Sequence, residues 1–179
     1  MRLICLLLSC LVFPLPVVAQ DVEVDVELFL AVDVSRSMSP QELEIQRRGY
    51  AEALSSDAVT RAITGGLLGQ IAVTYVEWAG EKSQRVVVPW TLITTPQEAQ
   101  GVARTITAAF DPGLRRTSIS GALRYAAEGL RDNEFIGLRQ VIDVSGDGPN
   151  NNRPGAGDAY VLFGDAAPSR TYDLAKNGV

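Results

Sequence analysis

The stretch Leu28–Ser37, with the sequence LFLAVDVSRS, decides how the rest of the chain is interpreted. Its first five residues are apolar, which predicts a strand buried on both faces of a sheet. The strand is followed by Asp33-Val-Ser-Arg-Ser37, which places one carboxylate and two hydroxyls in a short loop. Oxygen ligands of this kind suit a hard cation such as Mg²⁺ that keeps some of its waters. The alternative is that Asp33 and the serines make only turn and capping hydrogen bonds.

Strand-like and helix-like segments alternate along the chain. Two helix starts are marked by a capping box with a proline at the first helical position, Ser39-Pro-Gln-Glu42 and Thr95-Pro-Gln-Glu98. The pattern predicts strands at 27–33, 70–78, 84–90 and 139–145, helices at 40–55, 96–110 and 119–130, and a helical turn at 57–63. The short link 80–83 predicts an antiparallel pair, with Pro89 favouring an edge strand. The predicted fold class is α/β, a doubly wound, mostly parallel sheet with one antiparallel edge strand. Residues 21–27, which alternate charge and valine, are expected to form an exposed edge segment or a flexible arm.

Two further polar segments follow predicted elements of this sheet. Thr117 precedes the helix at 119–130, and Asp147 follows the strand at 139–145. Ligands in such folds bind at the carboxyl ends of the strands, so Asp147 is a candidate for the same site as Asp33. As alternatives, Thr117 caps the following helix and Asp147 belongs only to a turn. Asp143, inside an apolar strand, is expected to be a buried carboxylate bonded to loop amides.

These segments resemble the metal-ion-dependent adhesion site (MIDAS) of von Willebrand factor type A (VWA) domains. The resemblance covers residues 26–150 and is greatest for secreted, functionally uncharacterised bacterial members of that family. It implies that a divalent cation, Mg²⁺ or else Mn²⁺ or Ca²⁺, is held by Asp33, Ser35, Ser37, Thr117 and Asp147. It also implies a binding or adhesion function without catalysis, in which a protein partner supplies an acidic group to the cation.

Composition narrows the possible locations, chemistries and partners of the protein. Residues 1–19 have the three-part form of a signal peptide, so we expect a periplasmic or secreted protein. Both cysteines of the sequence, Cys5 and Cys10, lie in that segment, and there is no histidine, which excludes the usual zinc sites and histidine-dependent catalysis. The net charge of −5 argues against a nucleic-acid or anionic-membrane partner. No second apolar run has membrane-spanning length.

The C-terminal part departs from the resemblance. The family fold continues with two more strand and helix units, whereas residues 151–179 form an atypical tail without a helical stripe. We therefore expect a truncated or altered domain that lacks its last strands and leaves Ile142 and Val144 beside an open sheet edge.

Two other functions compete with the binding module. One is Mg²⁺-assisted phosphoryl transfer with Asp33 as the nucleophile. Against it, Ser35 stands where a second acid is usual, and the two lysines, Lys82 and Lys176, lie far from the motifs in sequence. The other is a remnant without metal function.

Overall fold

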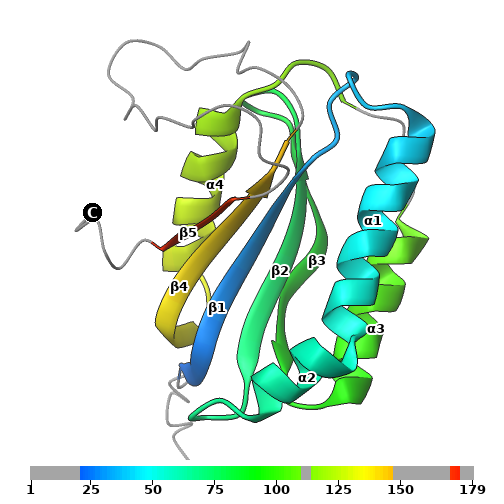
Figure 1. Ribbon diagram of the computed structural model, residues 1–179. Helices are drawn as coiled ribbons and strands as arrows, with labels where there is room; N and C mark the ends of the chain where they lie inside the picture. The colour runs from blue at the N-terminus through cyan, green and yellow to red at the C-terminus, as the bar shows by residue number, and fades with distance from the viewer. Residues whose placement is uncertain (1–20, 110–113, 147–169, 174–179) are drawn as a thin grey trace, which may run out of the picture.

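The apolar run that ends at Asp33 forms the central strand of the sheet. A computed structural model describes residues 21–109, 114–146 and 170–173. The described elements, drawn in Figure 1, are β1 (Val22–Asp33), α1 (Pro40–Ser55), α2 (Asp57–Thr64), β2 (Ile71–Trp78), β3 (Gln84–Ile93), α3 (Pro96–Ala108), α4 (Ile119–Arg131), β4 (Phe135–Ser145) and β5 (Arg170–Asp173).

The strand order is β3-β2-β1-β4-β5. β1 pairs in parallel with β2 on one side and with β4 on the other, so the carboxyl ends of these three strands lie at one edge. β3 runs antiparallel to β2 as an edge strand, which confirms the expectation from the short link and from Pro89. The α/β, mostly parallel fold class is thereby confirmed.

Helices cover both faces of the sheet (Figure 1). On one face, α1, α2 and α3 pack against the sheet through a core that includes Leu30, Tyr75 and Val102. On the other face, α4 packs against Phe29 and Trp78. A sheet buried on both sides requires strands that are apolar at successive positions, and every residue of β2 is buried.

The helix starts follow the predicted chemistry. Ser39 caps α1 and Thr95 caps α3, each in a complete capping box with a proline in the first turn. Such boxes satisfy two backbone N–H groups that a helix start otherwise leaves unpaired. The capping box at Ser39, two residues after the polar loop Asp33–Ser37, therefore fixes the start of α1.

β1 is longer than expected, and its first half is not a flexible arm. Residues 22–26 belong to the strand, because Val22–Val24 pair with β4 on one side and Val26 pairs with both neighbours. The two carboxylates that suggested exposure accept hydrogen bonds from distant backbone. Asp25 accepts from the amides of Leu68, Gly69 and Gln70, and buried Glu27 accepts from the amide of Gly137 at 2.6 Å.

We expected Ile142 and Val144 to lie beside an open sheet edge, and this prediction is wrong. β5 runs antiparallel to β4 and pairs with Val141–Val144, which includes both Ile142 and Val144. The sheet therefore has two antiparallel edge strands where one was expected. Residues 147–169 and 174–179, which make up most of the predicted tail, lie outside the described residues, as does the predicted signal peptide.

Candidate metal site at the carboxyl ends of the strands

The loop after β1 brings a carboxylate and two hydroxyls together. Asp33 is fully buried, and its Oδ1 accepts a hydrogen bond from the Ser35 amide at 2.7 Å. The Ser35 and Ser37 hydroxyl oxygens lie 2.8 Å apart, and Met38 N donates to the Ser35 carbonyl to close the turn. The loop thus gathers three oxygen ligands, and its one basic residue, Arg36, has an exposed side chain. This donor chemistry fits a hard divalent cation.

The loop before α4 is held against the first loop by backbone hydrogen bonds. Leu114 N donates to Val34 O at 2.8 Å, and Ser35 and Leu114 form a parallel bridge. Ser118 N donates to Ala79 O at 2.7 Å, which ties the same segment to the end of β2. Thr117, between these anchors, is buried at the same edge as Asp33.

The capping interpretation of Thr117 is wrong. The N-cap of α4 is Ser118, whose side chain accepts a hydrogen bond from Gly121 N at 3.2 Å. The predicted ligand and the helix cap are therefore two neighbouring residues.

The end of β4 passes directly beside Asp33. A Cβ added to Gly146 would lie 3.2 Å from Asp33 Oδ2 and 3.3 Å from the Trp78 ring. Any side chain at this position would crowd the carboxylate, so glycine keeps the space next to Asp33 open. Asp147, the next residue and a predicted ligand, lies outside the described residues. The structure thus brings Asp33, Ser35 and Ser37 into one loop and the Thr117 segment alongside it. The five-residue ligand set stays a prediction.

Within the described residues, no group of three or more Asp, Glu, His or Cys side chains gathers as a metal site. The predicted set differs from such groups because its described donors are one carboxylate and three hydroxyls. Hydroxyl donors leave most of the cation's charge uncompensated.

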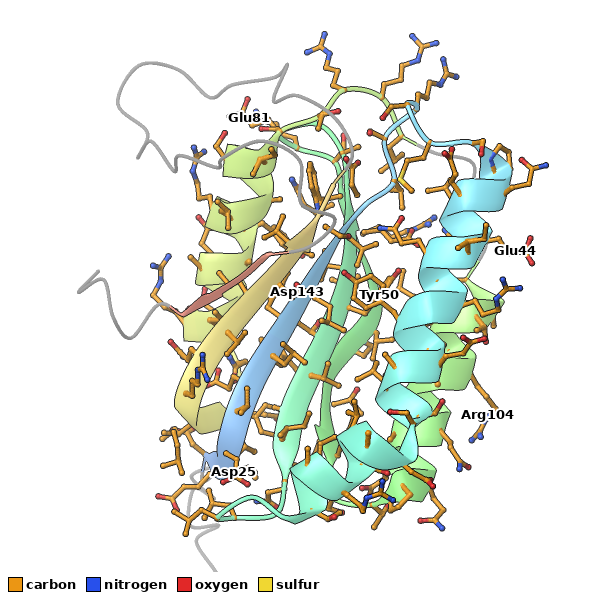
Figure 2. The ribbon with its side chains drawn as sticks, in the orientation of Figure 1. Asp25, Glu44, Tyr50, Glu81, Arg104 and Asp143 are labelled. Carbon is orange, nitrogen blue, oxygen red and sulfur yellow. The ribbon has the colours of Figure 1, made fainter. Side chains whose placement is uncertain are left out.

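Polar side chains on α1 reach the ends of the strands beneath the site. Gln46 Nε2 donates to Ser145 Oγ at 2.9 Å, and Tyr50 OH donates to Asp143 Oδ2 at 3.0 Å. Figure 2 shows Tyr50 between α1 and the sheet and Asp143 on the sheet. The sequence did not predict either contact. Asp143 is half-buried and bonds to a tyrosine, so the expected bonds to loop amides are not what the structure shows.

The Tyr50–Asp143 contact predicts a pH dependence of stability. Burial raises the pKa of Asp143 above its ordinary value of 3.8, and the hydrogen bond from Tyr50 offsets part of that rise. When a carboxyl has a higher pKa in the folded than in the unfolded protein, the folded protein loses stability as the pH rises from the unfolded pKa through the folded one. Asp143→Asn keeps an acceptor for Tyr50 and removes the charge. We expect it to be more stable than the wild type at pH 7, with a smaller difference near about pH 4.

Urea unfolding at the two pH values measures this effect. Asp132→Asn, an exposed site at the end of α4, is the control and should change stability little at either pH. An Asp143→Asn variant that is less stable than the wild type at pH 7 would contradict the prediction.

A buried ion-pair cluster, which the sequence did not predict, lies next to these contacts. Glu77 is fully buried, and its Oε1 lies 2.8 Å from Arg47 Nε and 2.7 Å from Arg47 Nη2. Arg85 from β3 binds the other carboxylate oxygen. Glu77 pairs with Val32 in the sheet, one register position before Asp33 and Trp78. The cluster therefore anchors α1 beside the strand ends that carry the site.

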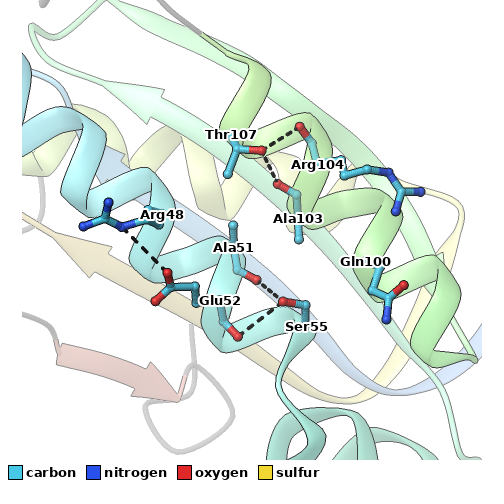
Figure 3. A pocket seen from close by; sticks show the side chains of 8 residues that line it. All are labelled: Arg48, Ala51, Glu52, Ser55, Gln100, Ala103, Arg104 and Thr107. Carbon is cyan, nitrogen blue, oxygen red and sulfur yellow. Dashed lines mark hydrogen bonds and ion pairs between the residues drawn. The ribbon is translucent and has the colours of Figure 1, made fainter.

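A shallow groove of about 280 Å³ lies between α1 and α3 (Figure 3). Four of its polar side chains are engaged locally: Arg48 lies 3.7 Å from Glu52, and the Ser55 and Thr107 hydroxyls donate to carbonyls of their own helices. The groove is formed by the second half of α1, away from the loop at Asp33. It offers no convergent set of polar groups, so we do not place the function there.

The comparison with protein families gives a direct result. Residues 23–164 match the family described as "Protein of unknown function (DUF1194)". The chain belongs to this family. The DUF1194 match covers every described element from β1 to β4 and extends past residue 150, where we expected the domain to end. No curated protein matches the chain significantly.

Solved structures show distant similarity to this DUF1194 chain. The three N-terminal domains of the type V pili tip protein Mfa5 from Porphyromonas gingivalis match 69% of this chain and 20% of their own, with 16% identity and a TM-score of 0.41. Proximal thread matrix protein 1 from the mussel byssus matches 76% of this chain and 33% of its own, with 18% identity and a TM-score of 0.48. The conserved hypothetical protein BatB from Bacteroides thetaiotaomicron matches 85% and 82%, with 14% identity and a TM-score of 0.42. The chain thus spans a third or less of the first two proteins.

In the described part of the chain, no helix is both long enough and apolar enough to cross a bilayer.

Proposed function

We propose that this chain is an exported binding module of the VWA kind that recognises a protein partner through a bound divalent cation. The observation that carries the proposal is the loop after β1. There, a buried carboxylate and two hydroxyls 2.8 Å apart lie at the carboxyl end of a central parallel strand. Asp33, Ser35, Ser37 and Thr117 would hold the cation together with Asp147, and Mg²⁺ is the ion that this oxygen set suits best.

The chemistry of this site is binding without catalysis. Two carboxylates and three hydroxyls leave a divalent cation able to accept a further anionic ligand, and the carboxylate of a partner protein supplies one. The cation, when bound, provides an electrostatic attachment point. The protein side chains orient it, and the packed sheet beneath keeps the loops in place.

The test is calorimetric titration of the mature protein with Mg²⁺, Mn²⁺ and Ca²⁺, alongside Thr117→Ala and Asp147→Ala. We expect the wild type to bind and both variants to bind about tenfold or more weakly, because each loses an oxygen ligand. Arg104→Gln, at an exposed position on α3, is the control and should bind as the wild type does. Equal binding heats for all four proteins, or none from the wild type, would refute the metal site. Turnover of a phosphate ester would favour the phosphoryl-transfer alternative.

A further inference from the structure

Three exposed arginines lie on the two loops of the candidate site. Arg36 is in the loop after β1, between Ser35 and Ser37, and Arg115 and Arg116 are in the loop before α4, next to Thr117. We call these three residues the arginine rim. The whole sequence has a net charge of −5, so a positive group at this end runs against the average charge of the protein.

The backbone brings the two parts of the rim side by side. Ser35 and Leu114 form a parallel bridge, and Leu114 N donates to Val34 O at 2.8 Å. Arg36 and Arg115 are the residues that follow this isolated bridge, so they belong to two segments held side by side. Both have exposed side chains and lie close in sequence to predicted ligands.

The backbone at Arg116 is held in an unfavourable conformation. Its φ of 72° is in the left-handed region, and among the described residues no other non-glycine residue has a positive φ. That conformation costs a residue with a Cβ roughly 1 kcal/mol, and glycine would adopt it without this cost. Residues held in this way are concentrated at binding sites and switch regions.

Two described glutamates at this end of the molecule have partners other than Arg36 and Arg115. Glu42 accepts from the Ser39 amide at 2.7 Å in the capping box, and Glu81 lies 3.8 Å from Arg124. Figure 2 shows Glu81 at the same end of the molecule as the strand ends. Asp33 is buried. Within residues 33–37 and 114–118, which the structure describes, the exposed charged side chains are therefore all arginines.

We propose that the arginine rim binds an acidic protein segment that carries several carboxylates, one for the cation and the others for the guanidinium groups. This inference rests on the proposed function and names its class of partner. Guanidinium groups bind carboxylates in a bidentate manner, which fixes orientation as well as charge. The negative net charge of the protein disfavours a long polyanion such as a nucleic acid, whereas a short acidic segment contacts only the rim.

Two synthetic peptides of equal length provide the test, one with a single glutamate and one with three, and fluorescence anisotropy at saturating Mg²⁺ measures their binding. We expect the wild type to prefer the triply acidic peptide. We expect Arg36→Gln/Arg115→Gln to lose roughly three- to tenfold of its affinity for that peptide while its Mg²⁺ affinity is not weakened. The loss should lie mainly in the association rate, and binding by the variant should depend less on salt. Arg104→Gln, an exposed arginine on the outer side of α3, should behave as the wild type does (Figure 2).

The outcomes separate this inference from the function on which it rests. If the wild type binds Mg²⁺ but treats the two peptides alike, the arginine rim does not select the partner and the metal site stands. If it binds no cation, the metal site fails. A preference for the triply acidic peptide that persists in EDTA and is lost in Arg36→Gln/Arg115→Gln would still support the rim. Stronger rim-dependent binding to phosphatidylglycerol vesicles than to either peptide would overturn the acidic protein segment as the partner.

Discussion

Replacing Glu77 with glutamine is expected to lower the free energy of unfolding by about 3–5 kcal/mol. The carboxylate is fully buried and compensates Arg47, which is itself only 6% exposed, and Arg85, whose side chain is partly exposed. Glutamine has nearly the same shape, so the change leaves a buried cation without its counter-charge and removes little packing. Losing one partner of a buried ion pair is costly for this reason. Urea unfolding followed by circular dichroism measures the effect through the midpoint at constant slope.

The chain offers matched controls for this prediction. Glu52 lies 3.7 Å from Arg48 on the exposed side of α1, and Glu52→Gln should cost less than about 0.5 kcal/mol. A combined Glu77→Leu/Arg47→Met variant removes the buried carboxylate and the more deeply buried cation together, and it should be more stable than Glu77→Gln. A Glu77→Gln protein within about 1 kcal/mol of the wild type would show that the cluster contributes little.

The elements of the fold are largely predictable because their signals are local. The apolar run before Asp33, the two capping boxes with proline and the link at 80–83 each act within a few residues. β1 was underestimated because Asp25 and Glu27 resemble exposed strand residues. Their partners, the amides at 68–70 and at Gly137, are remote in sequence. β5 was missed for a related reason, since a four-residue strand owes its existence to the edge of β4.

The candidate site also has a part that the local sequence predicts and a part that depends on contacts between distant segments. The loop Asp33–Ser37 is a local signal, because its hydrogen bonds join residues two positions apart. The contacts that fix its surroundings are non-local: Leu114 to Val34, Gln46 to Ser145 and the Glu77 cluster each join segments distant in sequence. Only the register of the sheet decides which strand residues meet Gln46 and Tyr50 of α1.

Asp33→Asn is expected to weaken Mg²⁺ binding by about a hundredfold or more, the upper end of the losses known for changes around metal ligands. In the wild type the Ser35 amide donates to Asp33 Oδ1 at 2.7 Å, and the asparagine Oδ1 can accept the same hydrogen bond. The loop therefore keeps its turn while the site loses a negative charge. Asp33→Ala removes the charge and this hydrogen bond together, and it should bind no better than Asp33→Asn.

Calorimetric titration gives the affinities, and circular dichroism verifies that each variant is folded. Asp57→Asn, at the exposed start of α2, should leave the affinity unchanged. An Asp33→Asn protein that binds Mg²⁺ as tightly as the wild type would show that the Asp33 carboxylate does not hold the cation. The predicted site has few carboxylates, so no other side chain can replace the charge of Asp33.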